Sequence, residues 1–220
     1  MCKILQMASQ HYLSARENWQ ILAQQGGTLA EKDTADTIRK YLDETYPGEW
    51  NVIRKPQHLR QIYYEYTRER HPERYVKPEH PTENDVWFCS ILKQFRTIKK
   101  AFAPGGGCEI DCMIEHASSG RKIFLEVKNQ GPVGNAHERA AKYATPSVIE
   151  HVKNKLGVSY IPFAYVFTGE MVERLDYRVE LETTYGFAPN HLFMWRKEHP
   201  TEPLIQWLET HILHLLKPAS

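Results

Sequence analysis

The amino-acid sequence predicts an α/β fold in which helices cover a central β-sheet. Short runs with strand-like alternation, at residues 108–114 and 122–128, are interleaved with stretches whose apolar residues recur at helical spacing. A continuous apolar run over Phe163–Thr168 is typical of a strand buried on both faces. The chain has 220 residues, of which 41% are hydrophobic, and it shows no internal repeat. These observations predict one layered domain over residues 1–220.

The N-terminal quarter of the chain is predicted to be mainly helical. Helices are expected over residues 8–25 and 30–45, separated by Gly26-Gly27, so that a helical part covers about residues 1–50. A first strand is expected over Trp50–Ile53, where aromatic and β-branched residues meet.

An irregular stretch followed by a long helix is predicted next. Charges, tyrosines and prolines crowd Tyr63–Pro81, which indicates irregular structure. A helix is expected from about Glu83 to Ala101, and Pro104–Gly107 should then turn the chain into the next strand. The apolar residues of this helix recur at helical spacing and indicate a core-facing side: Trp87, Ile91, Phe95, Ile98 and Phe102.

A β-hairpin is the most informative segment of the sequence. Its predicted strands run from Cys108 to Ile114 and from Lys122 to Lys128, joined by the polar turn His116–Gly120. Because side chains alternate along a strand, Glu126 and Lys128 share one face of the second strand. Its other face carries Ile123, Leu125 and Val127. On the first strand the same rule groups Glu109, Asp111 and Met113 on one face and Ile110, Cys112 and Ile114 on the other.

The chemistry of phosphodiester cleavage can use Asp111, Glu126 and Lys128. Two carboxylates and a DNA phosphate suit a hard cation such as Mg²⁺, which activates water and neutralises charge on phosphate. A lysine beside them can orient the nucleophile or stabilise the transition state. The spacing alone leaves a second interpretation open, namely the exposed side of an edge strand.

The elements after the hairpin alternate between helices and strands. A helix should open at Gly134–Arg139, after a short loop over Gln130–Val133. The further elements expected are a helix from Thr145-Pro146 to about Gly157, strands over Phe163–Thr168 and Leu192–Trp195, and an amphipathic helix over Pro203–Leu216.

The segment Gly134-Asn135-Ala136-His137-Glu138-Arg139 matches an element found just beyond the catalytic strand of EcoRI and MunI. The chain therefore resembles the type II restriction endonucleases of the MunI/EcoRI group, in the PD-(D/E)xK nuclease superfamily. Further matches to MunI follow in the same order along nearly the whole chain: Asn18-Trp19-Gln20, Lys55-Pro56, His58-Leu59, Pro162-Phe163, Val166-Phe167, Gly169 and Phe193-Met194-Trp195-Arg196.

This resemblance implies a mixed sheet flanked by helices and a homodimer that cuts palindromic DNA. It implies that Asp111 and Glu126 bind Mg²⁺ and that Lys128 is the catalytic lysine. The proline that often precedes the first acidic residue is Ile110 here. That proline is a backbone preference and not a metal ligand, so the departure does not affect the implied metal site.

By the same resemblance, the segment from Gly134 to Arg139 reads the inner bases AATT. Asn135 matches the donor and acceptor of the adenine edge, and Arg139 offers a rigid fork of donors. Ala136 and Glu138 complete the implied contacts. Asn135 and Glu138 also have the spacing of a helix capping box, and both roles are compatible. His137 is left open between a phosphate contact and packing at the dimer contact.

The outer base pair is not fixed by the sequence. MunI has an arginine immediately before the Gly-Asn-Ala element, tied by resemblance to its outer C·G pair, whereas this chain has Val133. A branched apolar side chain cannot make bidentate bonds to guanine, although it can contact a thymine methyl group. The expectation is a site that contains AATT without simple CAATTG specificity.

Charge is distributed in favour of DNA binding despite a net charge of only +1. Residues 51–100 contain 11 Lys or Arg against 6 Asp or Glu. Phosphate contacts need a local basic surface and not a basic protein. Lys55 and Arg60 are therefore predicted to contact DNA, and a solvated helix face is the alternative left open for any one of these basic residues.

Composition indicates a cytoplasmic enzyme. The segment Met1–Met7 lacks the apolar core of a signal peptide, and no run approaches the roughly 20 apolar residues of a membrane span. The four cysteines show no zinc-ligand spacing and are expected to be reduced. A methyltransferase that protects the same site is the implied cellular partner. Two alternatives remain open, an inactive DNA-binding protein and a less specific repair nuclease of the same fold.

Overall fold

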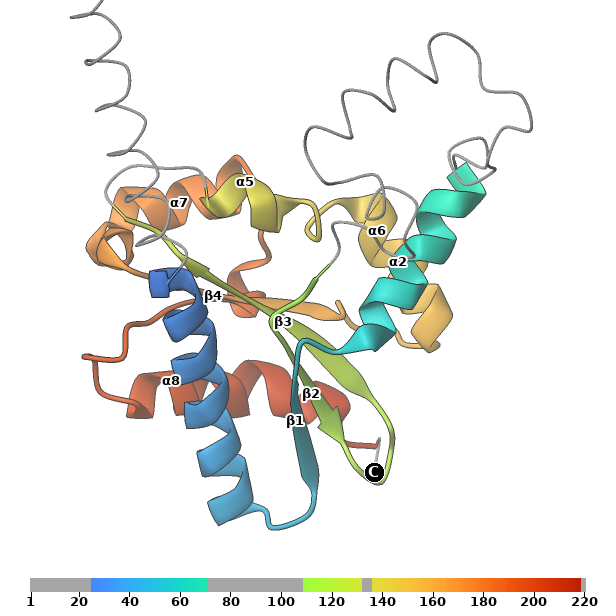
Figure 1. Cartoon of the computed structure of the whole chain (residues 1–220), viewed down its shortest axis with the longest axis horizontal. Coiled ribbons are helices and arrows are strands. Elements are labelled where there is room, and N and C mark those ends of the chain that lie inside the picture. The colour runs from blue at the N-terminus through green and yellow to red at the C-terminus, as the bar shows by residue number, and fades with distance from the viewer. Residues whose placement is uncertain (1–24, 71–108, 132–135, 219–220) are drawn as a thin grey trace, which may run out of the picture.

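A computed structural model describes residues 25–70, 109–131 and 136–218 (Figure 1). These residues form one sheet in which five strands lie in the spatial order β1-β2-β3-β4-β5. The strands are β1 Trp50–Arg54, β2 Cys112–His116, β3 Lys122–Asn129, β4 Phe163–Thr168 and β5 Leu192–Met194. The first three pair antiparallel and the last three pair parallel, so the sheet is mixed, as expected.

Helices cover both faces of the sheet (Figure 1). One face carries the helix of residues 25–45 and a C-terminal helical stretch made of α8 (Glu202–Trp207), a π-helical turn (Leu208–Leu213) and α9 (His214–Leu216). The other face carries α2 (Gln57–Arg70), α5 (Ala136–Ala141), α6 (Pro146–Leu156) and α7 (Leu175–Thr183). Two 3₁₀ turns, η2 (Glu170–Glu173) and η3 (Pro189–His191), flank α7 and β5.

The alternation along β3 divides the core into two parts. Ile123, Leu125 and Val127 pack with the helix of residues 25–45 and with the C-terminal helical stretch. Phe124 packs on the opposite face, with α2, α6 and α7. Glu126 lies two residues beyond Phe124 and therefore shares its face. The apolar pattern of one strand thus fixes which face carries the charged residues.

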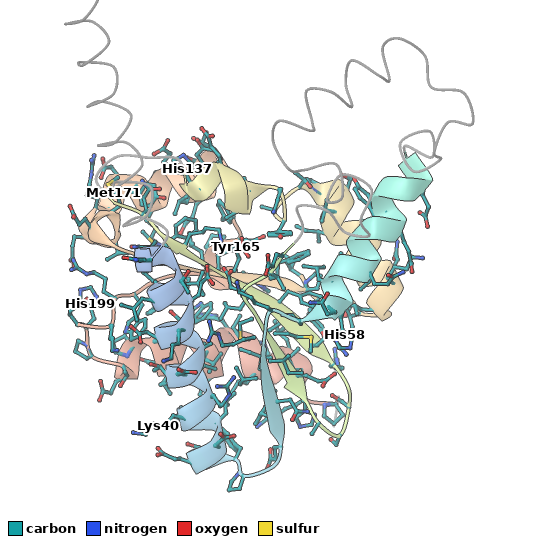
Figure 2. All side chains as sticks on the ribbon, in the orientation of Figure 1. Lys40, His58, His137, Tyr165, Met171 and His199 are labelled. Atoms are coloured by element: carbon teal, nitrogen blue, oxygen red, sulfur yellow. The ribbon has the colours of Figure 1, made fainter. Side chains whose placement is uncertain are left out.

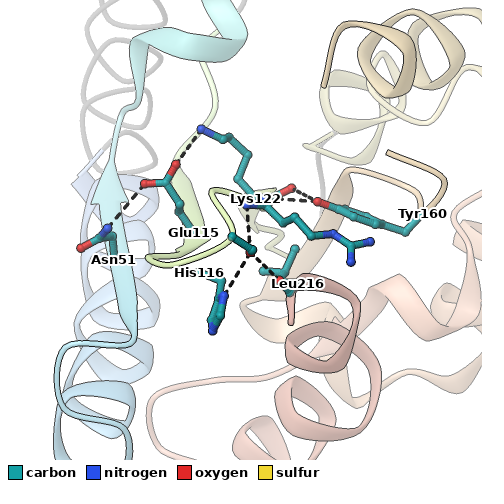
Figure 3. A network of polar contacts seen from close by, with 8 residues as sticks. Asn51, Glu115, His116, Lys122, Tyr160 and Leu216 are labelled. Atoms are coloured by element: carbon teal, nitrogen blue, oxygen red, sulfur yellow. Dashed lines mark hydrogen bonds and ion pairs between the residues drawn. The ribbon is translucent and has the colours of Figure 1, made fainter. Parts of the chain in front are cut away.

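A polar network holds the turn end of the β2–β3 hairpin (Figure 3). Lys122 Nζ lies 2.6 Å from Glu115 Oε1, across the two strands. Ser119 Oγ donates to the carbonyl of Leu216 at 2.9 Å, and the Tyr160 hydroxyl donates to the carbonyl of Lys122 at 2.9 Å. These bonds tie the turn to the C-terminal helical stretch and to the segment before β4. Asp111 and Lys128 lie at the other end of the hairpin.

Most elements predicted around the hairpin are confirmed. The predicted strands near residues 50, 122, 163 and 192 are β1, β3, β4 and β5. The helix from Thr145-Pro146 to Gly157 is α6, with Gly157 in the left-handed conformation at its C-cap. The C-terminal helix is confirmed over residues 202–216, although it contains a π-helical turn.

The predicted break at Gly26-Gly27 is wrong, because both glycines lie inside the helix that spans residues 25–45 of the described chain. A Cβ added at Gly26 would lie 3.0 Å from Nδ2 of Asn129, at the end of β3. The glycine therefore allows close approach of helix and strand, which a sequence pattern cannot distinguish from a helix break. The predicted helix of residues 8–25 otherwise lies outside the described residues.

The predicted irregular stretch at Tyr63–Pro81 is wrong over its first part, which continues helix α2 to Arg70. Leu59, on the first turn of this helix, is fully buried. Lys155 on α6 pairs with Glu65 and Glu69 on α2, at 2.9 Å and 3.7 Å. Packing on α6 thus stabilises a segment whose composition alone did not indicate a helix.

Other differences concern boundaries and missed elements. The first hairpin strand starts at Cys112 and not at Cys108, and α7 was not predicted. The predicted helix from Glu83 to Ala101 and the turn at Pro104–Gly107 lie outside the described residues. Within the part of the chain that the structure describes, no helix has the length and apolar character needed to cross a bilayer.

Gly169, at the end of β4, should tolerate no side chain. Its φ is 94°, and an added Cβ would collide with Asn129 Oδ1 and the carbonyl oxygen of Gln130. Gly169→Ala should lower the free energy of unfolding by at least about 2 kcal/mol, measured by urea denaturation. Gly186, with φ 69° and open space around it, is the control, and Gly186→Ala should cost only about 1 kcal/mol. An equal loss of unfolding free energy in the two variants would contradict the predicted collision at Gly169.

Candidate active site

The structure brings Asp111, Glu126 and Lys128 together at the end of the hairpin opposite its turn. Asp111 directly precedes β2, and the antiparallel register that pairs Cys112 with Leu125 places it beside Glu126. Lys128 Nζ lies 2.6 Å from Glu126 Oε1 and 3.2 Å from Asp111 Oδ2. One ammonium group thus contacts both carboxylates.

Backbone contacts hold Asp111 in place. The Val127 N–H donates to Asp111 Oδ2 at 2.7 Å, and the Lys55 N–H donates to the Asp111 carbonyl at 3.0 Å. Asp111 is only 7% exposed. It is therefore fixed between β3 on one side and the end of β1 on the other.

The predicted grouping of Ile110 with Cys112 and Ile114 is wrong. Ile110 is buried with Met113 and Phe124 on one face of the sheet, whereas Cys112 and Ile114 are buried on the other. The regular strand begins only at Cys112, so the alternation does not extend back to Ile110.

Glu126 is a buried carboxylate with one unused oxygen. It is 3% exposed, and its Oε2 has no hydrogen-bond partner among the described residues. Burial, with the charge of Asp111 acting in the same direction, raises the pKa of Glu126 to about 8, against the opposing effect of Lys128 and Lys142. An unpaired buried oxygen of this kind is unfavourable unless a ligand completes it.

Lys128 keeps its charge despite its burial. Burial lowers its pKa, but Glu126 and Asp111 more than offset that effect and raise the pKa above its usual value. The ammonium also donates to the Val127 carbonyl at 3.1 Å. These contacts fix its direction.

Glu31, on the helix of residues 25–45, is a third carboxylate that the sequence did not reveal. Burial and the charge of Asp111 raise its pKa, whereas Lys55 and Lys128 lower it, and its carboxyl group is close enough to share a hydrogen bond with Asp111. Its Oε2 is buried without a partner among the described residues. No local motif marks Glu31, because its contacts arise only when the helix packs across the end of the sheet.

The two central carboxylates fit a hard divalent cation. Asp111 and Glu126 offer oxygen ligands, and the unpaired Oε2 of Glu126 is available to one. Within the described residues, no three His, Cys, Asp or Glu side chains form a ready-made cage. A cation held here would take its remaining ligands from water and from a DNA phosphate, as Mg²⁺ commonly does.

Lys55 lies beside this cluster, whereas the side chain of Arg60 is not described. Lys55 directly follows β1 and has a positive φ of 48°, and its Nζ lies 3.5 Å from Glu109 Oε1. Arg60 belongs to α2. The predicted DNA contacts of Lys55 and Arg60 remain predictions.

Only part of the predicted recognition segment is described. Val133, Gly134 and Asn135 lie outside the described residues, and so does the predicted N-cap of Asn135. Helix α5 begins at Ala136, and Figure 2 shows His137 on it. Glu138 is exposed, whereas the side chains of Ala136 and Arg139 are not described.

A mixed sheet between two helical layers, with a buried Asp and Glu and a half-buried Lys at the end of a hairpin, defines the restriction-endonuclease-like class of nucleases. A family model described as type II restriction enzyme MunI matches residues 7–217. The chain therefore belongs to the MunI family of type II restriction endonucleases, which are site-specific deoxyribonucleases. Enzymes of this kind bind DNA and use a divalent metal ion.

Two comparisons with individual proteins agree with this family. The type II restriction enzyme MunI from a Mycoplasma species is 27% identical over 207 residues, which is 88% of this chain and 92% of that protein. The crystal structure of MunI endonuclease in complex with cognate DNA matches with a TM-score of 0.58 and 23% identity, covering 91% of this chain and 98% of that one. The second likeness shows a shared fold.

Divalent-metal affinity should increase with pH. Because the pKa of Glu126 is raised to about 8, its carboxyl group holds a proton at neutral pH that a cation must displace. Affinity for Ca²⁺ or Mg²⁺ should rise by up to about tenfold per pH unit below that pKa and then level off. Isothermal titration calorimetry of the metal-free protein measures this change. Glu126→Gln should make the metal affinity nearly independent of pH. A wild-type affinity that does not change with pH would contradict the prediction.

Proposed function

We propose that the protein is a homodimer that makes Mg²⁺-dependent double-strand cuts at a palindromic DNA site containing AATT. The observation that carries this proposal is the convergence of Asp111, Glu126 and Lys128, with Lys128 Nζ in contact with both carboxylates. The Asn135, Glu138 and Arg139 side chains supply the base-reading chemistry.

Each residue of the cluster takes a distinct role in the proposed reaction. Asp111 and Glu126 hold Mg²⁺, which when bound lowers the pKa of water and neutralises charge on the phosphate. Lys128 directs its ammonium group to the attacking water and to the charge that develops on the phosphate oxygens. The Val127 N–H keeps Asp111 oriented for this task.

The proposed bond changes are those of phosphodiester hydrolysis. The water oxygen bonds to phosphorus, the bond from phosphorus to the 3′ oxygen breaks, and the 3′ oxygen takes up a proton. The products carry a 5′-phosphate and a 3′-hydroxyl. Glu31, beside Asp111, adds a carboxylate that can accept a hydrogen bond from the water molecules around the metal.

Two subunits suit a palindromic site, because a two-fold axis relates both the subunits and the half-sites. We propose that residues 1–220 form one domain, that each subunit cuts one strand, and that the cuts leave four-nucleotide 5′ overhangs. The proposed setting is the cytoplasm, with a DNA methyltransferase that protects the same site as the cellular counterpart.

We propose that α5, which we call the recognition helix, reads the inner AATT. Gly134, Asn135 and Ala136 bring the chain to the base edges, and Glu138 and Arg139 follow on the first turn. Val133 precedes them and lacks donors for guanine. The outer pair is therefore read differently from the outer pair of MunI, and GAATTC, RAATTY and bare AATT are the candidate sites.

Substitutions in the charge cluster should stop cleavage without preventing DNA binding. Asp111→Ala removes a metal ligand and Lys128→Ala removes the ammonium, so both should leave no measurable cutting of plasmid DNA. Glu31→Gln should lower the rate by about 10–100-fold, because it changes a group behind the metal ligands. Wild-type turnover in Lys128→Ala would contradict the assignment of the catalytic strand.

Asn135→Ala is the comparison variant for the charge-cluster substitutions, since it removes a contact to a base and leaves the residues proposed for hydrolysis unchanged. It should weaken specific binding by about 1–3 kcal/mol, measured by gel shift in Ca²⁺, while binding to unrelated DNA stays unchanged.

The direct test is digestion of a DNA library randomised outside AATT, with and without Mg²⁺, followed by sequencing of the fragment ends. Uniform AATT overhangs that appear only with Mg²⁺ would support the proposal and identify the outer pair. Exclusive cutting of CAATTG would overturn the role given to Val133. Random ends would indicate a nuclease without this specificity, and DNA binding without cutting would indicate an inactive DNA-binding protein.

A further inference from the structure

We propose that His137 is a positioning residue that fixes the rotation of the recognition helix and thereby sets discrimination within AATT. This inference rests on the proposed function, because it takes α5 as the element that reads the bases.

The recognition helix is too short to set its own orientation. It spans only Ala136–Ala141, six residues, whereas isolated helices below about 12–15 residues are marginal in water. Its orientation must therefore come from contacts with the rest of the fold. On a helix, residues three apart share a face, which places His137 and Ala140 together.

The described side chains of this helix make small apolar contacts, through Ala140 and Ala141, and one polar contact, through His137. Ala140 is fully buried in the core that includes Tyr143 and Tyr177. His137 Nδ1 lies 3.3 Å from the hydroxyl of Tyr177 on α7, and its ring packs against Tyr185 with centroids 4.6 Å apart. A small alanine side chain allows the helix to rotate about its axis. The hydrogen bond between His137 and Tyr177 restricts that rotation, because it depends on both the distance and the direction between the two side chains.

This anchor acts on the neighbouring base-reading residue. Successive residues of a helix point about 100° apart, so the placement of His137 determines the direction of Glu138. Tyr185 lies near both residues, since the charge of Glu138 contributes to the raised pKa of that tyrosine, after burial and Glu180. Loss of the anchor would release the rotation of Glu138 and of the residues that follow it.

The same contacts argue against other roles for His137. A histidine that contacts phosphate or metal needs its ring directed toward that ligand, whereas this half-buried ring packs against two tyrosines. Tyr177 itself is only 2% exposed, so the anchor joins His137 to a residue of the core.

The experiment compares cleavage of the cognate site with cleavage of sites that carry one substitution within AATT. His137→Ala removes the ring and should lower this ratio by about tenfold, through faster cutting of the substituted sites. His137→Phe and Tyr177→Phe each remove the polar contact and keep a ring, so each should lower the cleavage ratio less than His137→Ala does. The double variant that combines His137→Phe with Tyr177→Phe should lower the cleavage ratio no more than either single variant does, because both substitutions delete the same contact.

His151→Ala is the matched control. His151, on α6, packs against the Tyr66 ring with centroids 5.0 Å apart, but it lies on another helix. It should lower thermal stability about as much as His137→Ala without changing the cleavage ratio. An unchanged ratio in His137→Ala would overturn the proposal and make His137 a packing residue. Equal losses of cognate cutting and of nonspecific DNA affinity would overturn it in favour of a phosphate contact.

The wild-type protein separates this inference from the proposed function. If the wild type cuts without preference for AATT, the proposed function fails, and the assignment of His137 fails with it. If the wild type is specific and His137→Ala is equally specific, only the assignment of His137 fails.

Discussion

The contact of one lysine with two buried carboxylates is the constraint on which this site depends. Two buried carboxyl groups this close together resist being ionised at the same time, and a shared cation and fixed hydrogen bonds offset part of the cost of their proximity. Lys128 supplies the cation, and the Val127 N–H supplies a fixed bond to Asp111. Val127 and Lys128 both lie on β3, so the pairing of β2 with β3 and the charge cluster require each other.

A helix and the end of a neighbouring strand both approach this end of the sheet. The helix of residues 25–45 brings Glu31 to Asp111, and its Gly26 approaches Asn129. From β4, Gly169 approaches the same asparagine. The end of β3 is therefore held from two directions, which provides the rigid support that a catalytic cluster needs. The turn end of the hairpin, held by its own polar network, contributes no charge to the site (Figure 3).

The features that could be predicted are those that leave a pattern among neighbouring residues in the sequence. Alternation along one strand was sufficient to place Glu126 and Lys128 on one face, and the continuous apolar run was sufficient for β4. Glu31 and Gly26 were missed or misread because their significance lies in contacts with residues far away in the sequence. For His137 the sequence left two roles open, since the tyrosines around it come from α7 and from the segment just after it, and the pattern did not indicate that helix. The outer-base reader at Val133 lies outside the described residues and stays a prediction.

The anchoring of Gln130 has an evolutionary consequence. Its N–H donates to the Thr168 carbonyl, its own carbonyl accepts from Met171, and it is 3% exposed. The catalytic strand is thus secured before the chain enters the segment that contains Val133. With the roles proposed above, mutations beyond this anchor would change which DNA sequences are cut while the hydrolytic apparatus is inherited intact, so related enzymes would diverge in target without rebuilding their chemistry.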